Sequence, residues 1–157
     1  MRRRRFLAVS VVCLAALVGT EAAQAKIVLQ SSISGIKLGM TRAEVRDRVE
    51  PSKIVRGRNE FGPYTIFQYF RLRVTFQGND GATAVSTTRW NQETPAGIHV
   101  RSTESQLRAA YPGARCRTEF GNFRHCWIGR FEAGRRVTDF RISAGRVRSI
   151  LIGFVID

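Results

Sequence analysis

Alternating apolar and polar positions predict a chain rich in β-strands. In RLRVTFQG (71–78), apolar residues at every second position alternate with polar ones, as in a strand with one covered face. The turn GNDG then separates this stretch from the next and favours a hairpin. The strands predicted from such patterns lie at 63–70, 71–78, 82–90, 123–131, 135–142 and 145–157.

Two related segments predict short helices. GIKLGMTRAEVRDRVEP (35–51) is echoed 62 positions later by GIHVRSTESQLRAAYPG (97–113). Each contains a capping box, T-x-x-E from Thr41 and T-x-x-Q from Thr103, and these motifs begin helices. A proline ends each helix after about nine or ten residues. Helices this short need a surface to pack on.

The two segments occupy equivalent places in a longer pattern. Each segment is followed by predicted strands. The motifs Glu-Phe-Gly and Val-Thr then occur in the same order after each segment. These matches indicate an internal duplication. We therefore predict an α+β fold of two tandem repeats, 26–93 and 94–157, each a short helix followed by an antiparallel β-meander. The helices are expected on one face of the sheet, with the two halves packed together.

Residues 1–25 have the composition of a signal peptide. Four arginines precede an apolar run of 13 residues, and Ala-Gln-Ala ends at Ala25. The alternative is a membrane anchor, but the run is shorter than the roughly 20 residues that span a bilayer. We predict cleavage after Ala25, a secreted or periplasmic protein and no transmembrane segment afterwards. The arginines also resemble a twin-arginine motif, so the export route stays open.

The remaining 132 residues carry a strong positive charge. Removing 1–25 leaves 22 basic and 11 acidic residues, a balance of +11. This charge favours an anionic partner, although a solvated basic surface explains it equally well. Neither an arginine-rich helix nor helix-turn-helix spacing is evident, so we do not expect a nucleic-acid partner.

The two cysteines that follow the predicted leader suggest a structural bridge. Cys116 and Cys126 flank RTEFGNFRH, and a hairpin centred on Gly121 would place them opposite each other. A metal site with His125 or a reactive thiol pair is the alternative. Because the sequence has no H-E-x-x-H, G-x-S-x-G or phosphate-binding glycine loop, we expect no enzyme, metal or cofactor.

The first helix segment carries a family resemblance. GMTRxEV (39–45), followed by V-x-P (49–51), resembles the helix signature of proteins like beta-lactamase inhibitory protein and of the small BamE/SmpA outer-membrane assembly lipoproteins. The match covers about 15 residues well and the second copy loosely. It implies tandem helix-plus-sheet repeats whose concave sheet binds a protein target. The anchoring cysteine of the lipoproteins is absent after residue 25, and Arg101-Ser102 replaces Gly-Met in the second copy.

Large apolar residues occupy both faces of two predicted strands, 63–70 and 123–131. One face must therefore contact something besides a helix. Packing between the halves would bury it, whereas an exposed aromatic and arginine surface would suit a protein partner. The candidate protein-binding residues are Phe67, Tyr69, Arg71, Arg73, Trp90 and Trp127.

We expect the first four of these candidates to share the face of the sheet that points away from the helices. The predicted function is a secreted, non-enzymatic and monomeric binding module that engages a protein through this open sheet face, with inhibition implied by analogy. The alternative is an electrostatic binder of an anionic cell-envelope polymer or lipid surface. Salt dependence separates the two.

Overall fold

A computed structural model describes residues 26–79 and 81–156, and the predicted signal peptide lies outside these residues. Most of the chain forms one eight-stranded antiparallel sheet, in the order β4-β5-β6-β7-β11-β10-β9-β8. The strands are β4 (Lys53–Asn59), β5 (Gly62–Tyr69), β6 (Leu72–Gln77), β7 (Ala82–Thr87), β8 (Arg115–Glu119), β9 (Phe123–Gly129), β10 (Arg136–Ser143) and β11 (Arg146–Phe154).

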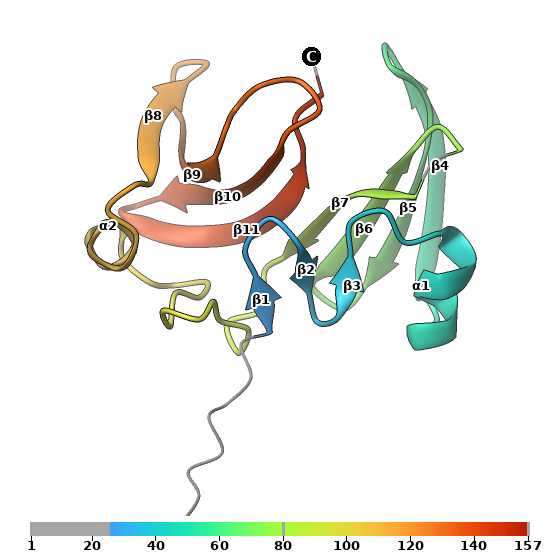
Figure 1. Ribbon diagram of the computed structural model, residues 1–157, viewed down its shortest axis with the longest axis horizontal. Helices are drawn as coiled ribbons and strands as arrows, with labels where there is room; N and C mark the ends of the chain where they lie inside the picture. The colour runs from blue at the N-terminus through green and yellow to red at the C-terminus, as the bar shows by residue number, and fades with distance from the viewer. Residues whose placement is uncertain (1–25, 80, 157) are drawn as a thin grey trace, which may run out of the picture.

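The sheet consists of two four-stranded meanders that are joined at its centre. β4 to β7 follow one another on one side, and β8 to β11 on the other. The two last strands, β7 and β11, pair antiparallel, with Val85 opposite Ile152. The resulting sheet is strongly curved, and its two ends rise on either side of the centre (Figure 1).

Two helices and a small sheet cover one face of the main sheet. The helices are α1 (Arg42–Arg48) and α2 (Glu104–Ala110), and the small sheet contains β1 (Ile27–Val28), β2 (Ser32–Ile33) and β3 (Ile36–Lys37). Figure 1 shows the small sheet between the two helices, all on the same side of the main sheet. We call this side the covered face and the opposite side the open face.

Each helix packs on its own meander through one fully buried apolar residue, Val45 in α1 and Leu107 in α2. In α1, the guanidinium of Arg46 lies 5.0 Å from the ring centre of Phe67 on β5. In α2, the capping residue Tyr111 stacks on Phe140 of β10. Both predicted capping boxes are present.

The small sheet fills the centre of the covered face. Ile27, Ile33 and Ile36 are almost completely buried in the core. The backbone amide of Gln30 donates to the hydroxyl of Thr138 on β10, which ties the small sheet to the second meander. These strands have only two residues each, too few for an alternating pattern to predict them.

The prediction of an α+β fold made of two tandem helix-plus-meander repeats was wrong. The described part of the chain is mostly β, with 50% of its residues in strands and 11% in helices, and these strands form a three-stranded and an eight-stranded sheet. Both helices stop after seven residues. The proline that follows each helix disfavours helical geometry in the residue before it, so Tyr111, just before Pro112, has ψ of 81°. Pairing of β7 with β11 then makes one continuous sheet.

Candidate functional site

The open face is defined by the strand register. Directly paired residues of antiparallel strands point to the same face, so the register traces rows of side chains across the sheet. One such row crosses all eight strands on the open face: Lys53, Gln68, Arg73, Ser86, Leu151, Asp139, Trp127 and Arg115. The neighbouring row on the covered face is Ile54, Phe67, Val74, Val85, Ile152, Thr138 and Ile128.

These two rows have opposite chemistry. The row on the covered face is apolar except for Thr138, as expected for a face that packs on helices. The row on the open face has three basic residues, one acidic residue and two other polar ones. The open face is thus built for contact with water or with a partner.

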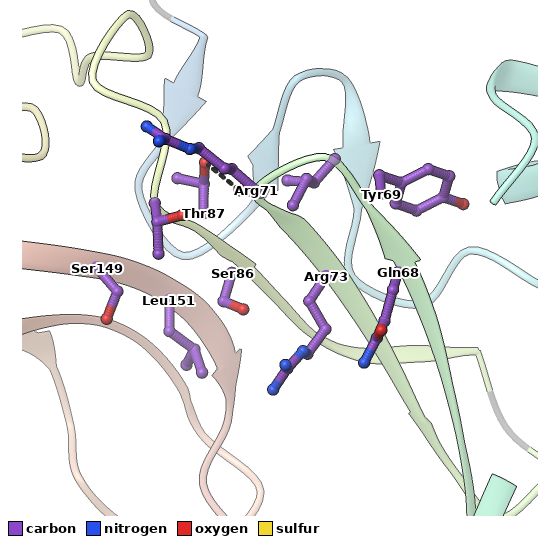
Figure 2. A pocket seen from close by; sticks show the side chains of 10 residues that line it. Gln68, Tyr69, Arg71, Arg73, Ser86, Thr87, Ser149 and Leu151 are labelled. Atoms are coloured by element: carbon purple, nitrogen blue, oxygen red, sulfur yellow. Dashed lines mark hydrogen bonds between the residues drawn. The ribbon is translucent and has the colours of Figure 1, made fainter. Parts of the chain in front are cut away.

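A hollow of about 400 Å³ lies near the joint between the meanders, beside the turn that links β5 and β6. From the open face it is lined by Gln68, Arg73, Ser86, Ser149 and Leu151, and from the adjoining strand ends and turns by Tyr69, Arg71, Leu72, Thr87 and Thr88; none of these residues is acidic. In Figure 2 the side chains of Arg73 and Gln68 point in the same direction from adjacent strands. This hollow, which we call the Arg73 hollow, is therefore positively charged.

The other end of the open face contains a buried histidine. His125 is 2% exposed, and its Nδ1 lies 2.5 Å from Oδ2 of Asp139 on the adjacent strand. Burial raises the pKa of the Asp139 carboxyl, and the hydrogen bond with His125 opposes this shift. The other ring nitrogen, Nε2, lies 3.7 Å from Oε1 of Glu119. Asp139 thus pairs with His125 of the neighbouring strand.

The imidazole of His125 is not paired with a nucleophile. Its sequence neighbour Cys126 points to the covered face and forms the predicted disulfide with Cys116. Carboxylates face both ring nitrogens instead. His125 therefore belongs to a network of carboxylates, and Cys126 cannot act with it as a nucleophile.

Arginines lie over aromatic rings around this network. The guanidinium of Arg117 is 5.2 Å from the ring centre of Trp127 and 5.7 Å from that of Phe131. Arg141 lies 5.4 Å from the ring of Phe123. Cation–π contacts of this kind hold the arginines over the rings and leave their outer sides accessible. The open face therefore ends in an aromatic and arginine surface.

Phe67 and Tyr69 lie on the covered face, so their predicted position on the open face was wrong. Phe67 is fully buried against α1, and Tyr69 is half-buried opposite Leu72. The reason is the two-residue turn between β5 and β6. Residues that flank such a turn are paired, so Tyr69 must share the face of Leu72 and the core.

Arg73 points to the open face as expected, but Arg71 does not join it. Arg71 lies in the turn with φ of 55°, and its guanidinium is 5.3 Å from the ring centre of Phe70. In Figure 2 its side chain points away from that of Arg73. The prediction that both arginines share one face was therefore wrong, because strand alternation ends at the turn.

The two tryptophans occupy different environments. Trp90 is 56% exposed in the loop after β7, with the guanidinium of Arg101 5.9 Å from its ring centre. Trp127 is 7% exposed on the open face, beneath Arg117 and Phe131. A binding role for either residue stays a prediction.

The disulfide uses the two cysteines that the alternative metal site would need as ligands. Within residues 26–79 and 81–156, Glu104, Cys116 and Cys126 form a group of possible metal ligands, but both sulfurs are in the disulfide.

The described ranges 26–79 and 81–156 include no helix that is long and apolar enough to cross a membrane.

Sequence reasoning missed most of the Arg73 hollow. Gln68, Ser86, Ser149 and Leu151 come from three strands, and the pairing of β7 with β11 brings Ser149 and Leu151 beside the first meander. Alternation within each strand predicts which face a residue occupies. It does not indicate which strand lies beside it.

The chain matches no protein-family model, no curated protein and no solved structure. Its function therefore rests on the geometry and chemistry of the open face.

Proposed function

We propose that this chain is an exported, non-enzymatic binding module that engages a protein partner through the open face of the eight-stranded sheet. The observation that carries the proposal is the open-face row from Lys53 to Arg115. Each of the eight strands contributes one residue to this row, and all but Leu151 and Trp127 are polar or charged. A curved sheet with one covered and one open face offers a broad surface whose backbone is already ordered. Such pre-organisation reduces the entropy cost of binding.

The composition of the open face supports a protein as the partner. Arg117 and Arg141 are held over Trp127, Phe131 and Phe123. Arginine and aromatic residues are enriched at the centres of protein interfaces, where they combine large apolar area with directed hydrogen bonds. The resemblance to beta-lactamase inhibitory proteins supports the same proposal and adds inhibition as a possible outcome of binding.

Export is supported by two independent features. Residues 1–25 have the composition of a signal peptide, and the Cys116–Cys126 disulfide is of the kind that persists in oxidising compartments. The excess of basic residues favours a partner with an acidic surface, which would also accelerate association.

The second candidate function is electrostatic binding of an anionic envelope polymer or lipid surface. It is favoured by the basic residues of α1, Arg42, Arg46 and Arg48, which place positive charge on the covered side as well. A polymer held by charge alone should dissociate steeply as salt rises, whereas an aromatic interface should weaken only in part.

Site-specific photo-crosslinking tests which face is used. A photoreactive residue replaces Gln68 or Ser149 on the open face, or Asp47 in α1 and Ser105 in α2 as matched controls on the covered side. Each variant is exposed to the envelope and secreted fractions of the source cells at low and high salt. We expect discrete protein adducts from the open-face positions that persist at high salt. Adducts from the helix positions alone, or adducts that vanish with salt from all positions, would contradict the proposal.

A further inference from the structure

We infer that the Arg73 hollow is the docking site for a single carboxylate of the partner, carried by an aspartate or glutamate side chain. The inference rests on the proposed function and names the chemistry of one anchor within the open face.

The first argument is position. Arg73 is flanked by Gln68 on β5 and Ser86 on β7, both directly paired with it, and Leu151 follows on β11. All four side chains come from the interior of strands, so the polar groups are held by the sheet itself. A site on rigid strands positions its ligand more accurately than a site on a loop.

The second argument is unbalanced charge. In the part of the chain that the structure describes, Arg117 and Arg124 are paired with Glu119 and Glu104, whereas Arg73 takes part in no ion pair. The nearest acidic residue in its row is Asp139, which is engaged by His125. The guanidinium of Arg73 therefore keeps its donors for a ligand.

The third argument distinguishes a carboxylate from a phosphate. Arg71 also lines the hollow, but its side chain points away from that of Arg73 (Figure 2), so the two guanidinium groups do not converge on one anion. One guanidinium matches a planar, singly charged carboxylate through two parallel hydrogen bonds. The amide of Gln68 and the hydroxyls of Ser86 and Ser149 add neutral donors, and Leu151 offers an apolar wall to the methylene groups of an acidic side chain.

The test follows the ¹⁵N-labelled protein by NMR during titration with N-acetyl-glutamate α-amide, whose only carboxylate is that of the side chain. We expect a saturable shift of the Arg73 Nε–Hε signal and of the Ser86 and Ser149 amides. Arg73→Gln should weaken binding about tenfold or more. Arg73→Lys should weaken it less, since lysine keeps the charge but cannot form the two parallel hydrogen bonds of a guanidinium. Arg58→Gln is the matched control: it removes the same charge from an exposed position on β4, outside the hollow, and should leave the affinity unchanged.

Two further probes identify the source of the anion. Tighter binding of methyl phosphate than of N-acetyl-glutamate α-amide would overturn the carboxylate assignment. Tighter binding of glucuronate would overturn the protein source in favour of an acidic polysaccharide.

A shift that fails to saturate, or that persists in Arg73→Gln, would show that the hollow is not a site. Arg73 is exposed, so an unchanged amide spectrum should confirm that the variants are folded. Photo-crosslinks from the open face without carboxylate binding would retain the proposed function and reject this anchor alone.

Discussion

The two meanders have the same strand order relative to the centre of the sheet, but their open faces differ. In the first meander, β4 to β7, Arg73 projects into a hollow and has no acidic partner among the described residues. In the second meander, β8 to β11, Arg117 pairs with Glu119, and His125 pairs with Asp139 beneath aromatic rings. Arg117 and Asp139 of the second meander are thus each paired, whereas Arg73 of the first meander is in no ion pair among the described residues. Similar backbones thus support different surface chemistry.

The edges of the sheet differ in a related way. The edge strand β8 is held to β9 by the Cys116–Cys126 disulfide. The edge strand β4 has no such link. Like β8 it carries charged residues, here Lys53, Arg56 and Arg58, which discourage unwanted strand pairing. The second meander is therefore covalently reinforced, while the first relies on packing.

The largest expected effect is in the core of the first meander. Phe67→Ala should lower the free energy of unfolding by about 3–5 kcal/mol, because it leaves a cavity beneath α1. Denaturant unfolding measures this loss. Arg73→Ala, on the opposite face of the adjacent strand, is the control and should change stability by about 0.5 kcal/mol or less. Equal losses from both variants would mean that the two faces are not distinct.

The next effect concerns the disulfide of the second meander. Replacing both cysteines by alanine should cost about 2–3 kcal/mol, because the unfolded chain gains the freedom of an open loop with its ends 10 positions apart. Thermal unfolding of the double variant and of the native protein measures the difference. Titration of the native protein should find neither Cys116 nor Cys126 as a free thiol. Two free thiols would overturn the structural role of the bridge.

The two helix caps should contribute equally to the free energy of unfolding. Thr41→Ala and Thr103→Ala each remove a hydroxyl that accepts from a backbone amide, and each should cost about 1 kcal/mol. Thr→Ser at the same positions keeps the hydroxyl and should retain most of the stability. A large difference between the two alanine variants would show that contacts beyond the caps hold one helix.

The smallest effect is a pH dependence specific to the second meander. Burial raises the folded-state pKa of Asp139 above its ordinary value of 3.8. The stability that this group contributes is therefore complete below pH 3.8 and is lost as the pH rises through its folded-state pKa. Compared with Asp139→Asn, the wild-type protein should lose stability over that interval.

Glu104 provides a comparison of opposite sign. The hydrogen bond from Arg124 lowers the pKa of Glu104, so its contribution is complete above its ordinary value of 4.5 and is lost as the pH falls through the folded-state pKa. Unfolding measured across this pH range for wild type, Asp139→Asn and Glu104→Gln separates the two groups. A wild-type profile that follows Asp139→Asn at every pH would contradict the role given to burial of Asp139.

Local features of the sequence predicted several parts of the structure. The capping boxes indicated where α1 and α2 begin, and the short spacing of Cys116 and Cys126 indicated a bridge across a hairpin. Alternation within 71–78 predicted that Arg73 points away from the helices. In each case the interacting residues are close in sequence or follow the regular period of one strand.

Only the tertiary structure decided how these parts combine. The pairing of β7 with β11 makes one mostly β sheet and assembles the Arg73 hollow, and the pairing of β9 with β10 brings His125 to Asp139. Tyr69 faces the core because of its turn partner Leu72, although the apolar pattern of its own strand fits either face. The period of a strand determines which residues share a face. Which strand lies beside it, and which face is covered, depend on packing between segments that are distant in sequence.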